Sequence, residues 1–192
     1  MMREVPGAIG FYAEEKPGAM KQASLLAERF EELFPRIYGY ALYRLRDPEE
    51  ADDIVSKTFT EAVSNIHRFD PEKGSLDTWL LAIARNVIRK YLRARRIRKL
   101  VSFELLSNNP STSLRWIEEI ADNNELLREV IPLLRRLPDR ERDILSLKFG
   151  AGITNRSIAE IVGLTESNVG VILYRTLRRL RDQLMEDDDV EI

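Results

Sequence analysis

Apolar residues recur at three- and four-residue spacing through most of the chain, and this period predicts amphipathic helices. No run of alternating β-branched residues is long enough to indicate a strand. The first helical pattern starts near Ala23 and carries Leu26, Phe30, Leu33, Phe34, Ile37 and Tyr38. Later stripes comprise Ala51, Ile54, Val55, Phe59 and Val63, and then Trp79, Leu80, Ile83, Val87 and Tyr91. Residues 23–100 are therefore expected to form one helical module.

Helix-start signals divide this module into its elements. Asp47 directly precedes Pro48, a pair typical of an N-cap followed by the first helical residue. Asp70 to Gly74 has the composition of a turn, and Ser75 can cap the long helix that follows it. We therefore expect helices to begin just after Asp47 and just after Ser75.

The second half of the chain is also expected to be helical. A helix from Glu125 to Leu137 is ended by Pro138, and another from Asp139 to Phe149 is ended by Gly150-Ala-Gly152. These helices and the two shorter ones that follow predict a second module over residues 124–184.

Three segments lack helical periodicity or carry biased composition. Residues 1–22 contain Pro and Gly at positions 6, 7, 17 and 18 and are expected to be a poorly ordered head. Residues 101–123 have the composition of a linker, and residues 185–192 form an acidic tail. The predicted fold is all-α, with two small helical domains joined by a flexible linker.

Residues 154–175 have the pattern of a helix-turn-helix. Ile158 and Ile161 are expected to face inward, and Ala159 is small where two helices approach. Gly163 permits a positive φ at the turn, and Thr165 can cap the second helix. The predicted inner stripe of that helix is Val169, Leu173, Leu177 and Leu180. Its outer face carries Ser167, Asn168, Val171, Tyr174, Arg175 and Arg178, and such a face fits a major groove.

Charge is unevenly distributed along the chain. The whole sequence carries a net charge of −2, which by itself argues against a nucleic-acid partner. Residues 23–100 and residues 124–184 each carry +3, whereas residues 101–123 carry −3 and the last eight residues carry −5. Residues 85–100 hold eight Lys and Arg residues and no acid. Two basic modules masked by acidic segments predict weak DNA binding by the isolated chain.

Composition excludes several kinds of chemistry. The chain has no cysteine and one histidine, His67, so it offers no disulfide, no thiolate and no multi-histidine metal site. It also has no glycine-rich loop of the kind that holds phosphates. We expect no enzyme activity, no cofactor and no metal. No signal peptide or membrane-spanning run is evident, so a cytoplasmic location without membrane insertion is expected.

Taken together, the two blocks resemble the extracytoplasmic-function (ECF) branch of the bacterial sigma-70 family over about residues 25–184. Residues 47–59 resemble the helix of that family that binds core polymerase. Residues 69–86 resemble its promoter-melting and −10 recognition segment, and the basic stretch through Arg96 continues that helix. Residues 137–145 together with the helix-turn-helix resemble its −35-binding domain. The resemblance implies an RNA polymerase sigma factor whose partners are core polymerase, promoter DNA and an anti-sigma factor.

The resemblance assigns residues to three surfaces. Binding of the −10 element falls to His67, Arg68, Phe69, Asp70, Lys73, Ser75, Trp79, Arg85, Asn86, Arg89, Lys90, Arg93 and Arg96. Here a loop would capture a flipped base while cations follow the backbone. Binding of the −35 element falls to Arg156, Ser167, Asn168, Gly170, Val171, Tyr174, Arg175 and Arg178. Core polymerase would meet Asp52, Asp53, Ile54, Val55, Ser56 and Phe59.

Two features depart from the family pattern. Ser56-Lys57 stands where the family usually has Gln and an acid, so contact with polymerase would differ there. Gly170-Val171-Ile172 stands where the recognition helix usually has Lys or Arg soon after Val169. Without those cations the helix lacks bidentate readout of guanine, which predicts a weak or A·T-rich −35 preference.

Other functions are possible from the residues alone. A stand-alone helix-turn-helix regulator would bind duplex DNA without polymerase, and this property distinguishes it from a sigma factor. A helical enzyme is opposed by the absent Cys and the single His. For Trp79, packing in the core is an alternative to contact with a base. A sigma-like domain that acts mainly as a partner of an anti-sigma factor is a further alternative.

Overall fold

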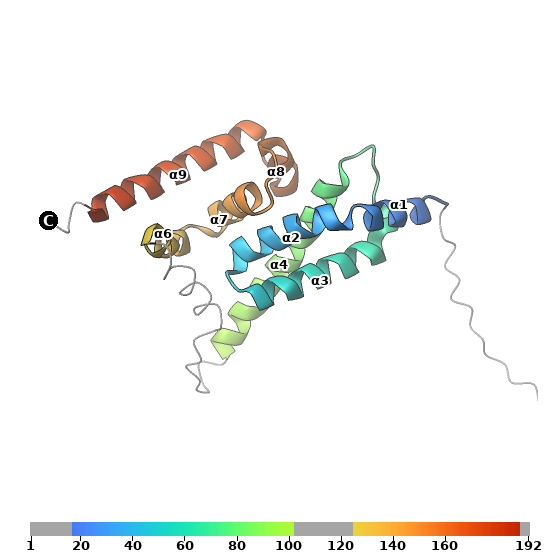
Figure 1. Cartoon of the computed structure of the whole chain (residues 1–192), viewed down its shortest axis with the longest axis horizontal. Coiled ribbons are helices and arrows are strands. Elements are labelled where there is room, and N and C mark those ends of the chain that lie inside the picture. The colour runs from blue at the N-terminus through green and yellow to red at the C-terminus, as the bar shows by residue number, and fades with distance from the viewer. Residues whose placement is uncertain (1–16, 102–124, 189–192) are drawn as a thin grey trace, which may run out of the picture.

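The computed structural model describes residues 17–101 and 125–188, and every regular element within them is helical. The N-terminal module contains α1 (Pro17–Glu28), α2 (Phe30–Leu45), α3 (Pro48–Asn65), the short 3-10 helix η1 (Ile66–Arg68) and α4 (Leu76–Val101). The C-terminal module contains α6 (Glu125–Arg136), α7 (Asp139–Leu145), the π-helical turn η3 (Ser146–Gly150), α8 (Asn155–Val162) and α9 (Glu166–Asp188). The all-α prediction is confirmed for the described residues (Figure 1).

Two predicted boundaries are wrong, and a third lies outside the residues that the structure describes. Helix α1 begins at Pro17, so the expected poorly ordered head is wrong for residues 17–22. Proline suits that position because its fixed φ is helical and its missing N–H has no intrahelical partner there. Helix α9 continues to Asp188, four residues beyond the expected end of the module. The expected linker, apart from Val101, lies outside the described residues.

The core of the N-terminal module lies between α2, α3 and α4. Asp47 caps α3 as predicted, because its side chain accepts the backbone N–H of Glu50 at 3.1 Å. The buried face of α3 follows helical spacing through Ala51, Ile54, Val55, Thr58 and Ala62. Val63, which the apolar pattern predicted to be buried, is 61% exposed, and the neighbouring Ala62 is buried in its place.

The helix-turn-helix forms as predicted from local signals. Thr154 and Thr165 cap α8 and α9, accepting the backbone N–H groups of Ser157 at 3.1 Å and Asn168 at 3.2 Å. Gly163 has a φ of 72°, in the left-handed region that favours glycine.

The inner stripe of α9 differs from the predicted one at a single position. It is made by Val169, Leu173, Thr176 and Leu180. The predicted Leu177 is 44% exposed, whereas Thr176 is buried. These buried positions are four, three and four residues apart, as the 3.6-residue helical turn requires. The prediction named Leu177 because leucine is apolar and the neighbouring Thr176 is polar.

The two modules pack directly against each other: η3 lies along α2, α8 lies against α4, and side chains of α7 bond to side chains of α2 (Figure 1). A close backbone approach joins Gly39 in the middle of α2 to Gly150 at the end of η3. A Cβ atom on Gly150 would lie 2.6 Å from the Gly39 carbonyl oxygen, closer than real Cβ contacts. Glycine in a helix interior costs about 1 kcal/mol, and the close approach explains why it is present at position 39.

Candidate nucleic-acid interface

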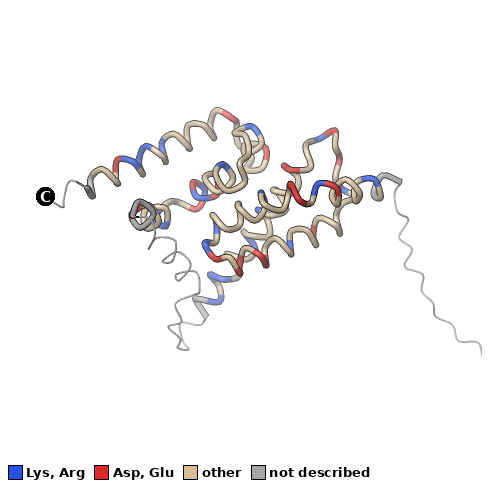
Figure 2. The backbone as a smooth tube through the Cα atoms, in the orientation of Figure 1, with Lys and Arg blue, Asp and Glu red and all other residues tan. Residues whose placement is uncertain are grey.

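Helix α4 presents the main cationic surface of the N-terminal module (Figure 2). Asn86, Arg89, Lys90 and Arg93 have exposed side chains along this helix. They line an open groove of about 660 Å³ together with Arg44 of α2, Glu61 of α3, Arg96 of α4 and Asp139 of α7. Five cations against two carboxylates make this groove a suitable site for a polyanion.

Several cations of α4 are held by carboxylates. Lys90 lies 3.3 Å from Glu61, and Arg95 lies 3.0 Å from Glu50, so these two pairs stay inside the N-terminal module. Arg85 and Arg96 instead bind carboxylates of α7 in the other module. Of the two arginines that pair with the other module, Arg85 is largely covered, whereas the Arg96 side chain is 67% exposed.

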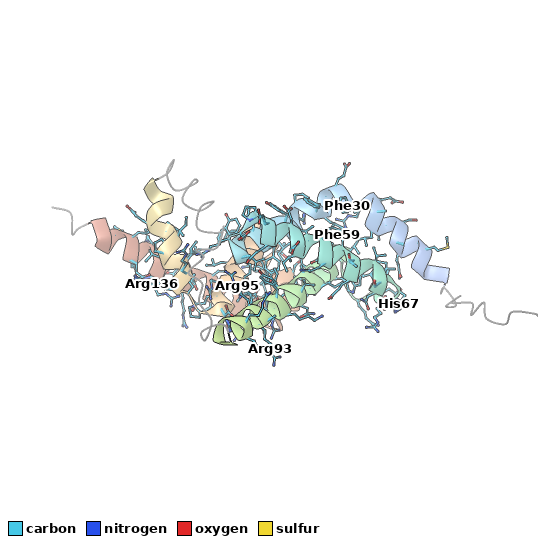
Figure 3. All side chains as sticks on the ribbon, turned by 90° about the horizontal axis from the view of Figure 1, so that it is seen from below. Phe30, Phe59, His67, Arg93, Arg95 and Arg136 are labelled. Carbon is cyan, nitrogen blue, oxygen red and sulfur yellow. The ribbon has the colours of Figure 1, made fainter. Side chains whose placement is uncertain are left out.

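The loop that precedes α4 holds the residues predicted to capture a base. His67 and Arg68 are exposed at its start, and Figure 3 shows His67 at the end of the module away from Arg93. Asp70 accepts the backbone N–H of Glu72 at 3.1 Å and pairs with Lys73 at 2.9 Å. The bond from Lys73 and then the bond from Glu72 lower the pKa of Asp70.

Two other loop residues, Phe69 and Ser75, have structural contacts. The Ser75 hydroxyl accepts the backbone N–H of Thr78 at 3.2 Å and so caps α4, as predicted. Phe69 is only 4% exposed and packs on the half-buried Trp79, with ring centroids 5.4 Å apart. Gln22 of α1 donates to the Phe69 carbonyl at 2.6 Å. The packing of Phe69 on Trp79 therefore fixes the loop to the start of α4.

In the C-terminal module, α9 carries the predicted −35 residues on its solvent side. Ser167, Asn168, Val171, Tyr174, Arg175 and Arg178 are all exposed. Arg156 on α8 is also exposed and lies 3.6 Å from Glu160. Gly170 lies beside Asn155 of α8, whose Nδ2 would be 3.8 Å from an added Cβ. The six α9 residues recur at three- and four-residue spacing and so share one face of that helix.

Helix α3 separates the predicted polymerase-binding residues into two groups. Asp52, Asp53 and Ser56 are exposed, whereas Ile54 and Val55 are buried in the core. The predicted contact of polymerase with the Ile54 and Val55 side chains needs correction. Both are buried where α3 packs against α2 and α4, so a docked protein would not reach them. Phe59 is half-buried at the edge of this face.

The sequence pattern did not predict an aromatic cluster beside Phe59. Phe30 of α2 packs on Phe59 with centroids 4.8 Å apart (Figure 3). The ring of Phe34 lies 5.7 Å from that of Phe30. Both α2 rings remain exposed, at 43% and 36%. Their helical spacing with Leu26 and Leu33 indicated core positions, and only the packing of α1 and α3 shows that the rings lie at its margin.

A second missed group lies between the modules. Tyr40 and Arg44 of α2 meet Asp139 and Asp143 of α7, residues far apart in the sequence. No local pattern signals this pairing, because each of the four residues is ordinary on its own helix. The signal available was Gly39, a glycine inside an otherwise regular amphipathic helix.

The described helices thus define a class: a two-module helical protein with a basic face on one module and a helix-turn-helix on the other. Comparison with known proteins makes this specific. The family model "Sigma-70 region 2" matches residues 29–97, and "Sigma-70, region 4" matches residues 133–182. The chain belongs to the sigma-70 family, in its ECF branch.

The relatives agree with this assignment. The chain is 27% identical over 173 residues to the ECF RNA polymerase sigma factor BldN of Streptomyces coelicolor, covering 87% of this chain and 62% of that protein. It is 26% identical over 145 residues to the ECF sigma factor SigM of Bacillus subtilis, covering 76% of this chain and 86% of that protein.

A solved structure has the same fold. The sigma factor RpoE of Bartonella quintana, in complex with the anti-sigma factor NepR, superposes with a TM-score of 0.61 at 20% identity. The match covers 91% of this chain and 99% of that one. Across residues 17–101 and 125–188 there is no group of three metal-ligating side chains, and none of the helices described there has the length and apolarity to cross a membrane.

Proposed function

We propose that this protein directs core RNA polymerase to specific promoters and assists DNA melting at the start of transcription. The observation that carries the proposal is the presence, on one chain, of a cationic α4 surface and an exposed helix-turn-helix face. The first suits a single strand and its backbone, and the second suits a major groove. The proposed role is that of a specificity subunit without catalytic chemistry.

The proposed division of work follows the exposed side chains. The loop over residues 67–75 captures an unstacked base of the −10 element, and Asn86, Arg89, Lys90 and Arg93 follow the DNA backbone. The outer face of α9 meets the −35 element through Ser167, Asn168, Val171 and Arg175. The exposed Asp52, Asp53 and Ser56 of α3, with Phe59 at its edge, dock on core polymerase.

An anti-sigma factor is a further proposed partner. The similar RpoE of Bartonella quintana has been solved in complex with the anti-sigma factor NepR. We infer that a regulator of the same class holds this chain, and pull-down of purified candidates with the full chain tests that inference directly.

Run-off transcription tests the main proposal. Core polymerase is supplied with a genomic promoter pool, with and without the full chain, and the start sites are mapped. New start sites that depend on the chain are expected. The matched variant Asp52→Lys/Asp53→Lys changes the exposed face of α3 and is expected to abolish them, whereas Glu31→Gln on α2 retains them.

A stand-alone helix-turn-helix regulator is the alternative, and family membership does not favour it. It predicts tight binding of the isolated chain to duplex promoter DNA and no dependence on core polymerase. A start-site map unchanged by the chain, together with tight autonomous binding, would replace the main proposal by this one.

A further inference from the structure

A buried carboxylate of the C-terminal module lies at the centre of the contact between the modules. Asp143 of α7 accepts a hydrogen bond from the Tyr40 hydroxyl at 2.6 Å and another from Arg85 Nε at 2.7 Å. Arg85 also donates to the carbonyl of Ile161, near the negative end of the α8 dipole, at 3.2 Å. The predicted DNA contact Arg85 is therefore bound to the other module through its guanidinium.

Tyr40 keeps its proton in this arrangement. Burial, and then the nearby Asp143 carboxylate, raise the pKa of Tyr40 well above its usual value. The hydroxyl therefore acts as a donor to Asp143 throughout the physiological range, and the two modules are joined by a charge-assisted hydrogen bond in a buried site.

A second carboxylate of α7 holds two more arginines of the N-terminal module. Asp139 lies 3.0 Å from Arg44 and 3.0 Å from Arg96, and it also pairs with Arg142 of its own helix at 3.0 Å. Burial alone would raise the pKa of Asp139, but the bond from Arg44 and the charges of Arg44, Arg96 and Arg142 lower it. Asp139 is therefore ionised, and it is one of the residues that line the α4 groove.

The same contact contains excess positive charge that the carboxylates do not neutralise. Arg44 Nε lies 3.7 Å from Asp143 and, within the described residues, has no hydrogen-bond partner. Arg46 donates to the Ile131 carbonyl at 3.2 Å, and burial followed by repulsion from Arg135 and other arginines lowers its pKa to about 10. Buried ions that are incompletely paired add little net stability of their own to this contact.

We propose that Asp139 and Asp143 form a carboxylate latch that competes with DNA phosphates for Arg85 and Arg96. In the closed form Arg85 is covered by α7 and α8, whereas Arg96 stays 67% exposed but is paired with Asp139, so carboxylates occupy both guanidinium groups. Opening separates the modules and releases both cations to the DNA backbone. This inference rests on the proposed function, since it assigns α4 to promoter DNA.

The glycine contact supplies a way to open the latch without touching a charged residue. Gly150→Ala places a methyl group against the α2 backbone, where the nearest atoms belong to Gly39 and Tyr40 and none is a flexible side chain. Gly150 has no positive φ, so alanine fits its own backbone. Gly74→Ala is the matched control, because nothing lies within 4 Å of an added Cβ there and its φ is not positive.

The first measurement is energy transfer between two fluorophores on the full chain. The sequence has no cysteine, so Tyr43→Cys and Arg140→Cys label only these two exposed positions, which flank the Arg44–Asp139 ion pair. High transfer is expected for the parent chain and for Gly74→Ala, and low transfer for Gly150→Ala with unchanged helical circular dichroism. Low transfer in the parent chain overturns the latch.

The second measurement is DNA affinity of the unlabelled chain as a function of salt, with a short labelled duplex as the probe. Gly150→Ala is expected to bind about tenfold more tightly. Its slope of log affinity against log salt is expected to steepen by about two units, one for each released arginine. Asp143→Asn, which keeps an acceptor for Tyr40, should steepen the slope as well, whereas Glu31→Gln on α2 should leave it unchanged.

The outcomes separate the latch from the proposed function. The latch is overturned if the modules open without a steeper salt slope of DNA affinity. It is also overturned if energy transfer stays high in both Gly150→Ala and Asp143→Asn. In either case, run-off transcription by the parent chain would still support the sigma role. Conversely, an opened variant that binds DNA more tightly but yields no start sites with core polymerase supports the latch and contradicts the sigma role.

Discussion

The two longest described helices, α4 and α9, differ in what binds their cationic side chains. On α4, Arg85 and Arg96 bind carboxylates of the opposite module, whereas on α9 the ion pair of Arg178 is with Asp182 of the same helix, at 3.6 Å. Arg179 of α9 pairs with Glu141 inside the same module. The difference indicates that the surface proposed for the −35 element is open in the described arrangement. The surface proposed for the −10 element becomes complete only when the modules part.

The largest expected effect tests whether the exposed cations of α4 contact DNA. Arg89→Ala/Arg93→Ala should reduce the salt dependence of promoter binding by the assembled polymerase by about two units, one per lost phosphate contact. Arg95→Ala is the control on the same helix, because Arg95 is bonded to Glu50 at 3.0 Å and is expected to leave the slope unchanged. Titrations of promoter binding over a range of salt provide the slopes. Equal slopes for all variants would remove Arg89 and Arg93 from the interface.

A smaller effect concerns specificity on α9. Val171 is exposed at 41% on the outer face, where an arginine could reach a guanine edge. Val171→Arg should therefore add a preference for G worth roughly 1–3 kcal/mol, measured by selecting promoters from a random library. Leu177→Arg adds the same charge to a different face of the helix and should add no base preference.

The same library tests the unsubstituted recognition helix. Without a cation at position 170, 171 or 172, the parent chain is expected to select a weak or A·T-rich −35 sequence. A strongly enriched G in the selections with the parent chain would contradict this expectation, since no described side chain at those positions provides bidentate donors.

The smallest effect concerns stability. Gly170→Ala should raise the free energy of unfolding by about 1 kcal/mol, because alanine favours a helix interior and its Cβ would meet Asn155 at an ordinary 3.8 Å. Gly163→Ala should lower it by a similar amount, because φ there is 72°. Thermal unfolding of both variants provides the comparison, and a loss of stability in Gly170→Ala would show that a side chain strains the helix-turn-helix.

Local chemistry determined which segments form helices and where most of them begin. Asp47, Ser75 and Thr165 cap helices at the predicted places, and Gly163 makes the predicted turn. These features depend on neighbours within a few residues, so the sequence reports them directly. The structure reports which of the proposed −10, −35 and polymerase contacts are exposed, and their roles remain predictions.

Only the tertiary structure decided which face of each helix is buried and which charges are paired. Periodicity predicted Val63 and Leu177 as core positions, but the packing of neighbouring helices buries Ala62 and Thr176 instead. The pairing of Arg85 with Asp143 joins residues 58 positions apart, and that of Tyr40 with Asp143 spans 103 positions. Such contacts depend on where two modules meet, and that geometry leaves no periodic pattern in either helix. The amino-acid pattern by itself therefore determined two basic helical modules, whereas their packing decided which arginines are free to bind DNA.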